Sequence, residues 1–208
     1  ALPLLVLPRS SDEGKAAVSK TRVILYFLAI GIAFLFMEIA FMQRFILFLH
    51  HPLYSFAVTL AAFLVFAGAG SYLSASMARF YSRRTLLLVS VTGILLFGLG
   101  YIILLDNLFV WLSAVPVLLK IILTVLLVAP LALLMGMPFP LALSSLADHA
   151  EALVPWAWGI NGCASVISAS LATLLAIHFG FSTVIMLALI LYAGVVFVYP
   201  GPRRAVTD

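Results

Sequence analysis

The sequence predicts an all-α integral membrane protein: a bundle of six transmembrane helices, preceded by the end of a further helix. Of the 208 residues, 65% are hydrophobic and only 9% are charged, whereas an average soluble domain is about half apolar and about a quarter charged. The apolar residues form runs of about twenty or more, the length that a helix needs to cross a hydrocarbon layer of about 30 Å. Because these runs are continuously apolar and do not alternate, they exclude a transmembrane β-barrel.

Short polar breaks separate the six expected spans. The first span, if helical, is roughly 42 Å long at about 1.5 Å per residue, so it must tilt, bend or project from the membrane. Residues 108–115 and the amphipathic segment 141–154 are expected to be connections outside the spans. The spans cover residues 22–49, 53–77, 85–105, 116–137, 156–178 and 182–199.

The basic residues predict an orientation. With residue 9 on the cytoplasmic side, only Arg44 and Lys120 lie toward the outside, against nine basic residues in inside loops, which is a positive-inside pattern. Both ends of the segment are then cytoplasmic. We divide the chain into residues 1–21 (the end of a preceding helix and a cytoplasmic loop), 22–200 (the six-span domain) and 201–208 (a cytoplasmic tail). The inside residues are Arg9, Lys15, Lys20, Arg22, Arg79, Arg83, Arg84, Arg203 and Arg204.

Three polar residues of the first span form a candidate intramembrane site. Glu38 is expected roughly 22 Å deep, where a charged side chain costs at least about 3 kcal/mol. It is either a proton- or cation-responsive carboxylate that faces the bundle or a structural acid hydrogen-bonded to a neighbouring helix. Gln43 is expected to bond another helix, and Arg44 to reach lipid headgroups. Glu38 and Arg44 are six residues apart, so they do not meet on a straight helix.

The fifth span contributes the other polar candidates, Asn161 and Ser168. This span is our first choice for the partner of Glu38. In "PWAWGINGCASV" (155–166), Asn161 brings a carboxamide about one turn into the span, either to line a substrate or ion path or within a helix end that only anchors and packs. Ser168 belongs to a stripe of small residues at four-residue spacing, which allows close approach of helices.

Small and aromatic residues predict the packing positions. The second span carries a similar small-residue stripe around Gly70, so we expect the second and fifth spans to form the tightly packed centre of the bundle. Gly31 lies on the face of Glu38, which places that acid against protein. Gly162 is expected to allow close packing, and Trp156 and Trp158 to anchor the span at the membrane interface.

Several other kinds of chemistry find no support in the sequence. The lone Cys163 cannot form a disulfide or a thiolate metal site within one chain. "FAGAGSY" (66–72) lacks the third glycine and the preceding strand of a dinucleotide-binding motif. No nucleophile–base set is visible. We therefore expect no catalytic residues, metal site or cofactor in this chain, and no nucleic-acid partner.

Four stretches together resemble the membrane portion of bacterial multi-pass spermidine synthase-like proteins, which carry a polyamine aminopropyltransferase-like domain. They are "FLAIGIAFLFMEIAFMQRFILFLHHPLYS", "FAGAGS", "MGMPFPLAL" and "PWAWGINGCASV". The resemblance implies the bacterial inner membrane, and it implies that a transferase domain lies elsewhere in a longer polypeptide. The positions that match its motifs are Glu38, Gln43, Arg44, Trp156, Trp158, Asn161 and Gly162.

We therefore expect a non-catalytic membrane domain that anchors a spermidine synthase-like protein and binds or conducts a small cationic or amphiphilic substrate past Glu38 and Asn161. The first alternative is a structural accessory subunit packed against a larger membrane complex. The second is a part of a membrane-bound aminopropyl- or methyltransferase. The expected partners are the lipid bilayer and either partner subunits or the rest of a longer polypeptide.

Overall fold

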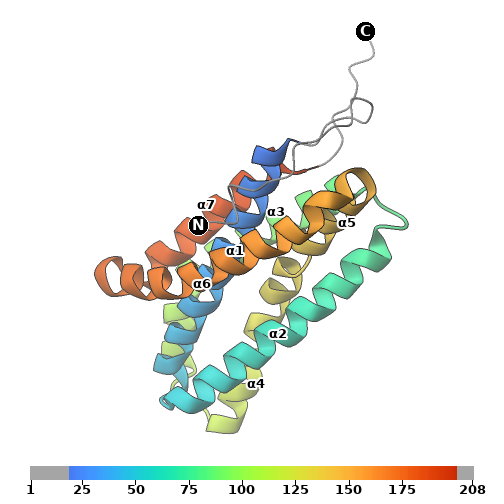
Figure 1. The fold of residues 1–208 in the computed structure, drawn as a ribbon. Helices are drawn as coiled ribbons and strands as arrows, with labels where there is room; N and C mark the ends of the chain where they lie inside the picture. Colours follow the sequence, from blue (N-terminus) through green and yellow to red (C-terminus); the bar gives the residue numbers. More distant parts are fainter. Residues whose placement is uncertain (1–18, 201–208) are drawn as a thin grey trace.

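A computed structural model describes residues 19–200, which are helical and contain no strand, as Figure 1 shows. The predicted all-helical class is confirmed. The expected end of a preceding helix and the expected tail 201–208 lie outside the described residues. The elements are α1 (Lys20–Leu49), α2 (Pro52–Met77), α3 (Arg83–Trp111), α4 (Val117–Met135), α5 (Pro138–Ala150), a short 3₁₀ turn η2 (Glu151–Leu153), α6 (Val154–Phe179) and α7 (Phe181–Val198).

Five helical stretches are long and apolar enough to cross a membrane, not the six that we predicted. The difference arises in the 63-residue stretch Val117–Phe179, which contains both the fourth and the fifth predicted spans. Pro138 and Pro155 each occupy the first turn of a helix, α5 and α6 respectively. Proline is tolerated there because the first-turn N–H groups have no partner within the helix. The chain therefore bends without an extended loop.

The third helix is longer than predicted. We expected a span over 85–105 and an interfacial connection over 108–115, but α3 continues to Trp111. Asp106 and Asn107 are poor helix formers but do not stop a helix. Proline kinks or breaks a helix, and the first proline of this region is Pro116, the residue before α4.

Helix α1 is the centre of the bundle, as it packs against α2, α4, α5, α6 and α7. Our prediction that the second and fifth spans form the centre is wrong. Sixteen of the 30 residues of α1 are buried, against six of the 26 in α2 and six of the 26 in α6. The difference follows from side-chain size, because the large aromatic side chains of α1, among them Phe27, Phe41 and Phe45, are fully buried and bury the most apolar area.

Small residues nevertheless bring one pair of helices into close contact. A methyl group in place of a hydrogen of Gly70 would overlap the carbonyl oxygen of Leu133, and one at Gly136 would overlap the carbonyl oxygen of Ala67. The backbones of α2 and α4 therefore touch where both helices lack side chains, as in other tightly packed membrane helices. Gly70 has the packing role that we predicted for it, but toward α4.

The two ends of the bundle differ in charge. At the basic end, α1 begins, α2 ends and α3 begins. At the distal end, α1 ends, α2 begins, α3 ends and α4 begins (Figure 1). Five of the seven Lys and Arg residues between 19 and 200 lie at the basic end, and the other two, Arg44 and Lys120, lie toward the distal end. The five are Lys20, Arg22, Arg79, Arg83 and Arg84.

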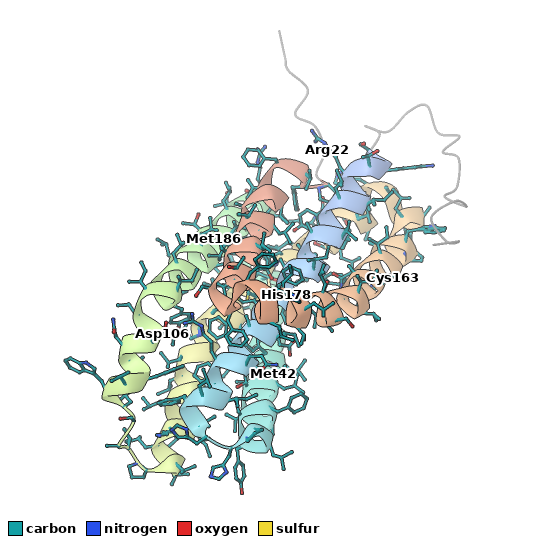
Figure 2. All side chains as sticks on the ribbon, turned by 90° about the vertical axis from the view of Figure 1, so that its left-hand side faces the viewer. Arg22, Met42, Asp106, Cys163, His178 and Met186 are labelled. Atoms are coloured by element: carbon teal, nitrogen blue, oxygen red, sulfur yellow. The ribbon has the colours of Figure 1, made fainter. Side chains whose placement is uncertain are left out.

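The outer surface of the bundle is apolar. Large hydrophobic side chains stand out from every helix except α5, as Figure 2 shows for the whole bundle. An apolar surface of this extent suits a hydrocarbon environment, and monomeric soluble proteins rarely expose one. The architecture is compatible with that of a multi-pass helical membrane protein. Examples of the exposed residues are Leu53, Val65, Phe80, Leu96, Leu118, Val166 and Phe197.

Candidate functional site

Glu38 lies in the interior, near the middle of α1. Only 5% of the residue is exposed, and its Oε1 atom has no hydrogen-bond partner among residues 19–200. The acid therefore faces protein, as its position on the face of Gly31 predicted. Its expected partner on α6 is not found. The structure leaves a buried carboxyl group whose hydrogen-bonding capacity is not used within the described chain.

Arg44 has a different environment. It is 6% exposed, its Nη1 atom lies 3.0 Å from Oδ1 of Asp106 on α3, and its Nη2 atom donates to Ser182 Oγ on α7 at 2.7 Å. Our prediction that Arg44 reaches headgroups is wrong, because the arginine side chain is itself buried and bonds a carboxylate and a hydroxyl from two other helices. Glu38 and Arg44 are not partners, as predicted. Arg44 joins three helices.

Gln43 and Ser168 contribute little to a shared polar site. Gln43 is half-buried and makes no hydrogen bond to another described residue. Ser168 is buried, but its hydroxyl donates to the carbonyl of Ala164 on its own helix at 2.5 Å. Such a bond satisfies the hydroxyl locally. Ser168 therefore supports helix packing rather than a ligand or Glu38.

Asn161 belongs to a pocket of about 280 Å³ between α1, the α4–α5 junction, α6 and α7. A methyl group at Gly31 would lie 2.9 Å from Asn161 Oδ1 and from the Ala164 methyl, so this glycine brings α1 close to α6, as predicted. The Asn161 carboxamide has no hydrogen-bond partner within the described chain. The pocket residues are Ile30, Gly31, Phe34, Leu35, Met135, Pro138, Phe139, Asn161, Ser165 and Tyr192.

Glu38 does not line this pocket. It lies seven residues beyond Gly31, roughly 10 Å along α1. The structure therefore does not bring Glu38 and Asn161 into one cavity, although we expected both along one path. The polar side-chain groups of the pocket wall are uncharged: the Asn161 carboxamide, the Ser165 hydroxyl and the Tyr192 hydroxyl. The Ser165 hydroxyl donates to the backbone carbonyl of Asn161 at 2.9 Å.

The three remaining predicted packing residues, Trp156, Trp158 and Gly162, lie in the first turns of α6. Trp156 is half-buried against the core, while Trp158 is largely exposed and packs its ring against Phe139 at 4.8 Å. Both positions are compatible with an interfacial anchor. Gly162 is exposed, and a methyl group there would meet nothing within 4 Å. Within the described chain it has no close-packing role, so this prediction is wrong.

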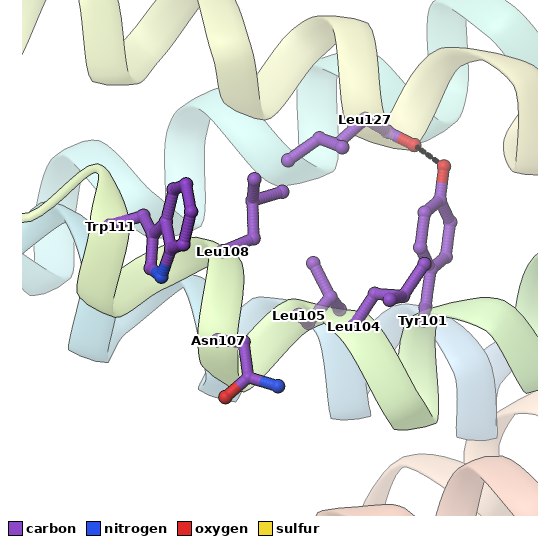
Figure 3. Close-up of a pocket in the computed structure, with 7 residues that line it drawn as sticks. All are labelled: Tyr101, Leu104, Leu105, Asn107, Leu108, Trp111 and Leu127. Carbon is purple, nitrogen blue, oxygen red and sulfur yellow. Dashed lines mark hydrogen bonds between the residues drawn. The ribbon is translucent and has the colours of Figure 1, made fainter.

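A second pocket, of about 330 Å³, lies between α3 and α4 near the distal end (Figure 3). Its polar groups are few. The Tyr101 hydroxyl donates to the Leu127 carbonyl at 2.6 Å, and Asn107 points away from the leucine side chains. The lining residues are Tyr101, Leu104, Leu105, Asn107, Leu108, Trp111 and Leu127.

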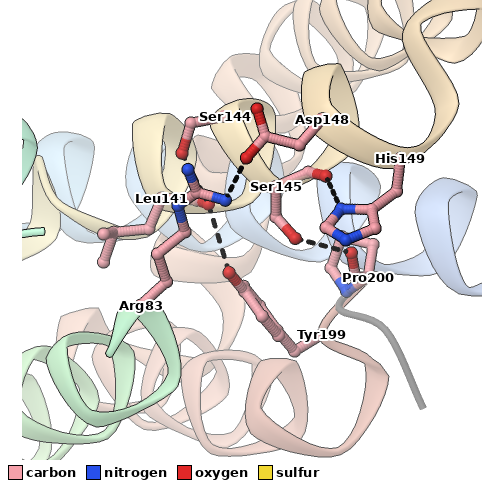
Figure 4. Close-up of polar contacts among 8 residues, drawn as sticks. All are labelled: Arg83, Leu141, Ser144, Ser145, Asp148, His149, Tyr199 and Pro200. Atoms are coloured by element: carbon pink, nitrogen blue, oxygen red, sulfur yellow. Dashed lines mark hydrogen bonds and ion pairs between the residues drawn. The ribbon is translucent and has the colours of Figure 1, made fainter. Parts of the chain in front are cut away.

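A polar cluster ties α3, α5 and the end of α7 together at the basic end (Figure 4). Arg83 pairs with Asp148 at 2.6 Å, the Ser145 hydroxyl donates to the Pro200 carbonyl, and the Tyr199 hydroxyl donates to the Leu141 carbonyl at 3.2 Å. Each of these side chains has a partner inside the cluster. The arrangement fixes the orientation of α5 and leaves no reactive group free.

Sequence reasoning missed Asp106 and Ser182 as partners of Arg44. The sequence could have indicated Asp106, because it is the only Asp or Glu between residues 39 and 147. It also follows the end of the third predicted span, on the side of the membrane where Arg44 was expected. Ser182 carried no such pattern, since hydroxyls are common in these helices. Between residues 19 and 200, no three His, Cys, Asp or Glu residues are grouped so as to hold a metal ion.

No family model, curated protein or solved structure matches the chain. The resemblance to spermidine synthase-like membrane proteins therefore rests on the four sequence stretches alone. The structure itself is that of a helical bundle whose length and apolar surface are compatible with a multi-pass membrane protein.

Proposed function

We propose that the chain is a non-catalytic multi-pass membrane domain that binds a small amphiphilic molecule and anchors a longer polypeptide. The observation that carries the proposal is the pocket at Asn161. Its wall is mostly apolar, and it has one carboxamide without a partner among the described residues. Ligand pockets commonly combine apolar walls with a few polar groups that orient the ligand.

The pocket favours an amphiphile over a cation. Asp, Glu, Lys and Arg are absent from its lining residues, and Glu38 lies outside it. A polyamine would bring two or more charges into an apolar cavity without a counter-charge, which is costly. A ligand with a short hydrocarbon chain and one hydroxyl or amide group fits the volume of about 280 Å³ and can bond the Asn161 carboxamide.

Anchoring rests on the apolar exterior and on the charge distribution. The concentration of basic residues at the basic end supports a cytoplasmic position for that end. The bacterial inner membrane, and a transferase domain elsewhere in the polypeptide, rest on the four resembling stretches.

The second candidate is a structural subunit of a larger complex. The close packing around α1 favours this candidate. The pairing of Arg44 with Asp106 favours it too, because it uses two charged groups that a transport path would need. This alternative predicts that no small molecule binds saturably in the pocket.

A binding experiment tests the proposal. The purified protein in nanodiscs is titrated with a short n-alkyl alcohol and with the n-alkyl amine of equal chain length, and binding is followed by ligand-observed NMR. Saturable binding of the alcohol, stronger than that of the amine, is expected. Ser165→Phe should fill the pocket and abolish binding, and Asn161→Leu should weaken it about tenfold, which corresponds to about 1.4 kcal/mol.

Ser170→Phe is the matched control, because Ser170 is exposed on the same helix. It adds the same bulk outside the pocket and should leave binding unchanged. If Ser165→Phe and Ser170→Phe bind the alcohol equally well, the amphiphile site is excluded and the structural alternative is preferred.

A further inference from the structure

Two buried polar atoms lack a hydrogen-bond partner between residues 19 and 200: Glu38 Oε1 on α1 and Thr59 Oγ1 on α2. Thr59 is fully buried. Buried side-chain polar atoms in native proteins nearly always have a partner, so each exception needs an explanation. Two exceptions on helices that pack against each other suggest a common cause.

The pairing of α1 and α2 places these two residues at about the same level. The helices are joined by a turn of only two residues, His50 and His51, and therefore run antiparallel. Ser55 Oγ donates to the Met42 carbonyl at 3.3 Å. Glu38 lies four residues before Met42 and Thr59 four residues after Ser55, so both lie one turn further from the turn between the helices.

Ring contacts extend this register. The rings of Phe34 and Phe63 lie 6.2 Å apart, one further turn along each helix, and Phe63 also lies 5.9 Å from Phe41. Glu38 and Thr59 are thus enclosed between a polar contact on one side and aromatic packing on the other. Both lie at matching positions in the register of the hairpin that α1 and α2 form.

The buried basic side chains nearest to Glu38 along the bundle, Arg44 and Lys120, interact with other residues. Arg44 pairs with Asp106 and Ser182, and the Lys120 ammonium of α4 lies 5.3 Å from the centre of the Phe48 ring, ten residues beyond Glu38. Nothing in the described chain makes an ion pair with Glu38.

The other titratable groups on the helices around α1 are not placed to serve Glu38 either. Tyr54 and Tyr72 of α2 and Cys163 of α6 are exposed, and His178 of α6 is exposed and bonds the Leu174 carbonyl. Asp148 and His149 of α5 take part in the cluster at the basic end, and Tyr192 of α7 lines the Asn161 pocket.

We propose that Glu38 is a proton-binding site: its carboxyl group is protonated in the folded bundle, and after side-chain rotation its O–H donates a hydrogen bond to Thr59 Oγ1. A carboxylate accepts hydrogen bonds only, whereas the protonated acid gains an O–H donor. The neutral acid also avoids an uncompensated charge in the apolar interior. The proton comes from water and returns to it, and no other bond changes.

This site is a binding site for a proton rather than for a metal ion, because one carboxyl and one hydroxyl supply too few oxygens for Na⁺ or Ca²⁺-type coordination. Release of the proton would leave a buried carboxylate without a counter-charge, which is costly in the folded bundle. The inference does not rest on the proposed amphiphile pocket, since neither Glu38 nor Thr59 lines that pocket.

Infrared spectroscopy tests the protonation state. The chain has three glutamates, Glu13, Glu38 and Glu151, so labelling with ¹³C-glutamate and subtraction of the Glu38→Gln spectrum isolates Glu38. The protein is measured in nanodiscs at neutral pH. The carbonyl stretch of a protonated carboxylic acid is expected. A carboxylate band from Glu38 instead would overturn the proposal.

Thr59 variants test the partner. Thr59→Val keeps the shape and removes the hydroxyl, so the Glu38 carbonyl stretch should shift to higher frequency, and Thr59→Ser should restore it. An unchanged band in Thr59→Val would exclude Thr59 as the acceptor. Glu38→Gln should retain the melting temperature of the wild type and its binding of the n-alkyl alcohol, which separates failure of this site from failure of the pocket.

Discussion

At the scale of the residue, the two buried ionisable side chains of α1 differ in their hydrogen-bond partners. Arg44 has a carboxylate and a hydroxyl from two other helices, while Glu38 has no ion pair within the described chain. A guanidinium stays charged in proteins and must be bonded, whereas a carboxyl group can become neutral. The difference in chemistry explains why one site is a structural junction and the other a candidate for proton binding.

The Arg44–Asp106 pair should contribute measurably to stability. Asp106→Asn keeps the size and removes the charge, leaving the guanidinium with weaker acceptors. Because the Asp106 side chain is 74% exposed, solvent screening limits the loss to about 1 kcal/mol. Thermal unfolding in detergent should show a melting temperature lower by about 2–4 °C.

Asp148→Asn is the matched control for this prediction, since it breaks the Arg83–Asp148 pair at the basic end, in which the arginine side chain is 33% exposed against 7% for Arg44. Its effect should be smaller than that of Asp106→Asn. An equal effect of the two variants would show that burial of Arg44 adds nothing to the pair.

At the scale of the element, helix packing depends on where a glycine lies rather than on how many glycines a helix has. Gly70 allows the backbone of α2 to touch that of α4, while Gly162 lies on an exposed face of α6. Both glycines occur beside other small residues in the sequence. Only the positions of the neighbouring helices distinguish them.

Gly70→Ala should destabilise the bundle by about 1–3 kcal/mol, because the added methyl group overlaps the Leu133 carbonyl and forces α2 and α4 apart. Gly162→Ala should be neutral or stabilising by up to about 1 kcal/mol, since alanine is the better helix former and the site is open. Unfolding in mixed micelles with increasing denaturing detergent measures both. Equal stability of the two variants would contradict the α2–α4 contact.

The start of α3 depends on a side-chain cap. Ser82 Oγ accepts a hydrogen bond from the backbone N–H of Thr85 at 3.1 Å. Ser82→Ala removes this acceptor and should cost about 1 kcal/mol, while Ser82→Asp should retain the cap. Hydrogen exchange of the first turn of α3 is the local measurement. Unchanged exchange in Ser82→Ala would show that the cap is not needed.

At the scale of the whole molecule, the separation of basic residues predicts the orientation of the bundle. In a Cys163→Ser background, Tyr81→Cys at the basic end and His51→Cys at the distal end both place a thiol at an exposed position. A membrane-impermeant maleimide added to intact cells should label His51→Cys only, and should label Tyr81→Cys only after the membrane is opened. The reverse pattern would invert the proposed topology.

Much of the fold could be predicted from the sequence, because lipid-length apolar runs need no tertiary information. The first helix was predicted at 22–49 and is found at Lys20–Leu49. The fourth and fifth spans were harder, since prolines that can end a helix can also begin one. The order of packing was not predictable, because helices that are apolar on every face do not reveal which face is buried.

The sequence by itself determined the helical class, the position of most helices, the unequal charge of the two ends, and the presence of an acid within an apolar helix. These follow from composition and from local geometry. The tertiary structure alone decided that α1 is central, that Arg44 binds an aspartate 62 residues away, and that Asn161 and Glu38 lie in separate places. Such facts depend on contacts between residues distant in the chain, and no local pattern of apolar residues encodes them.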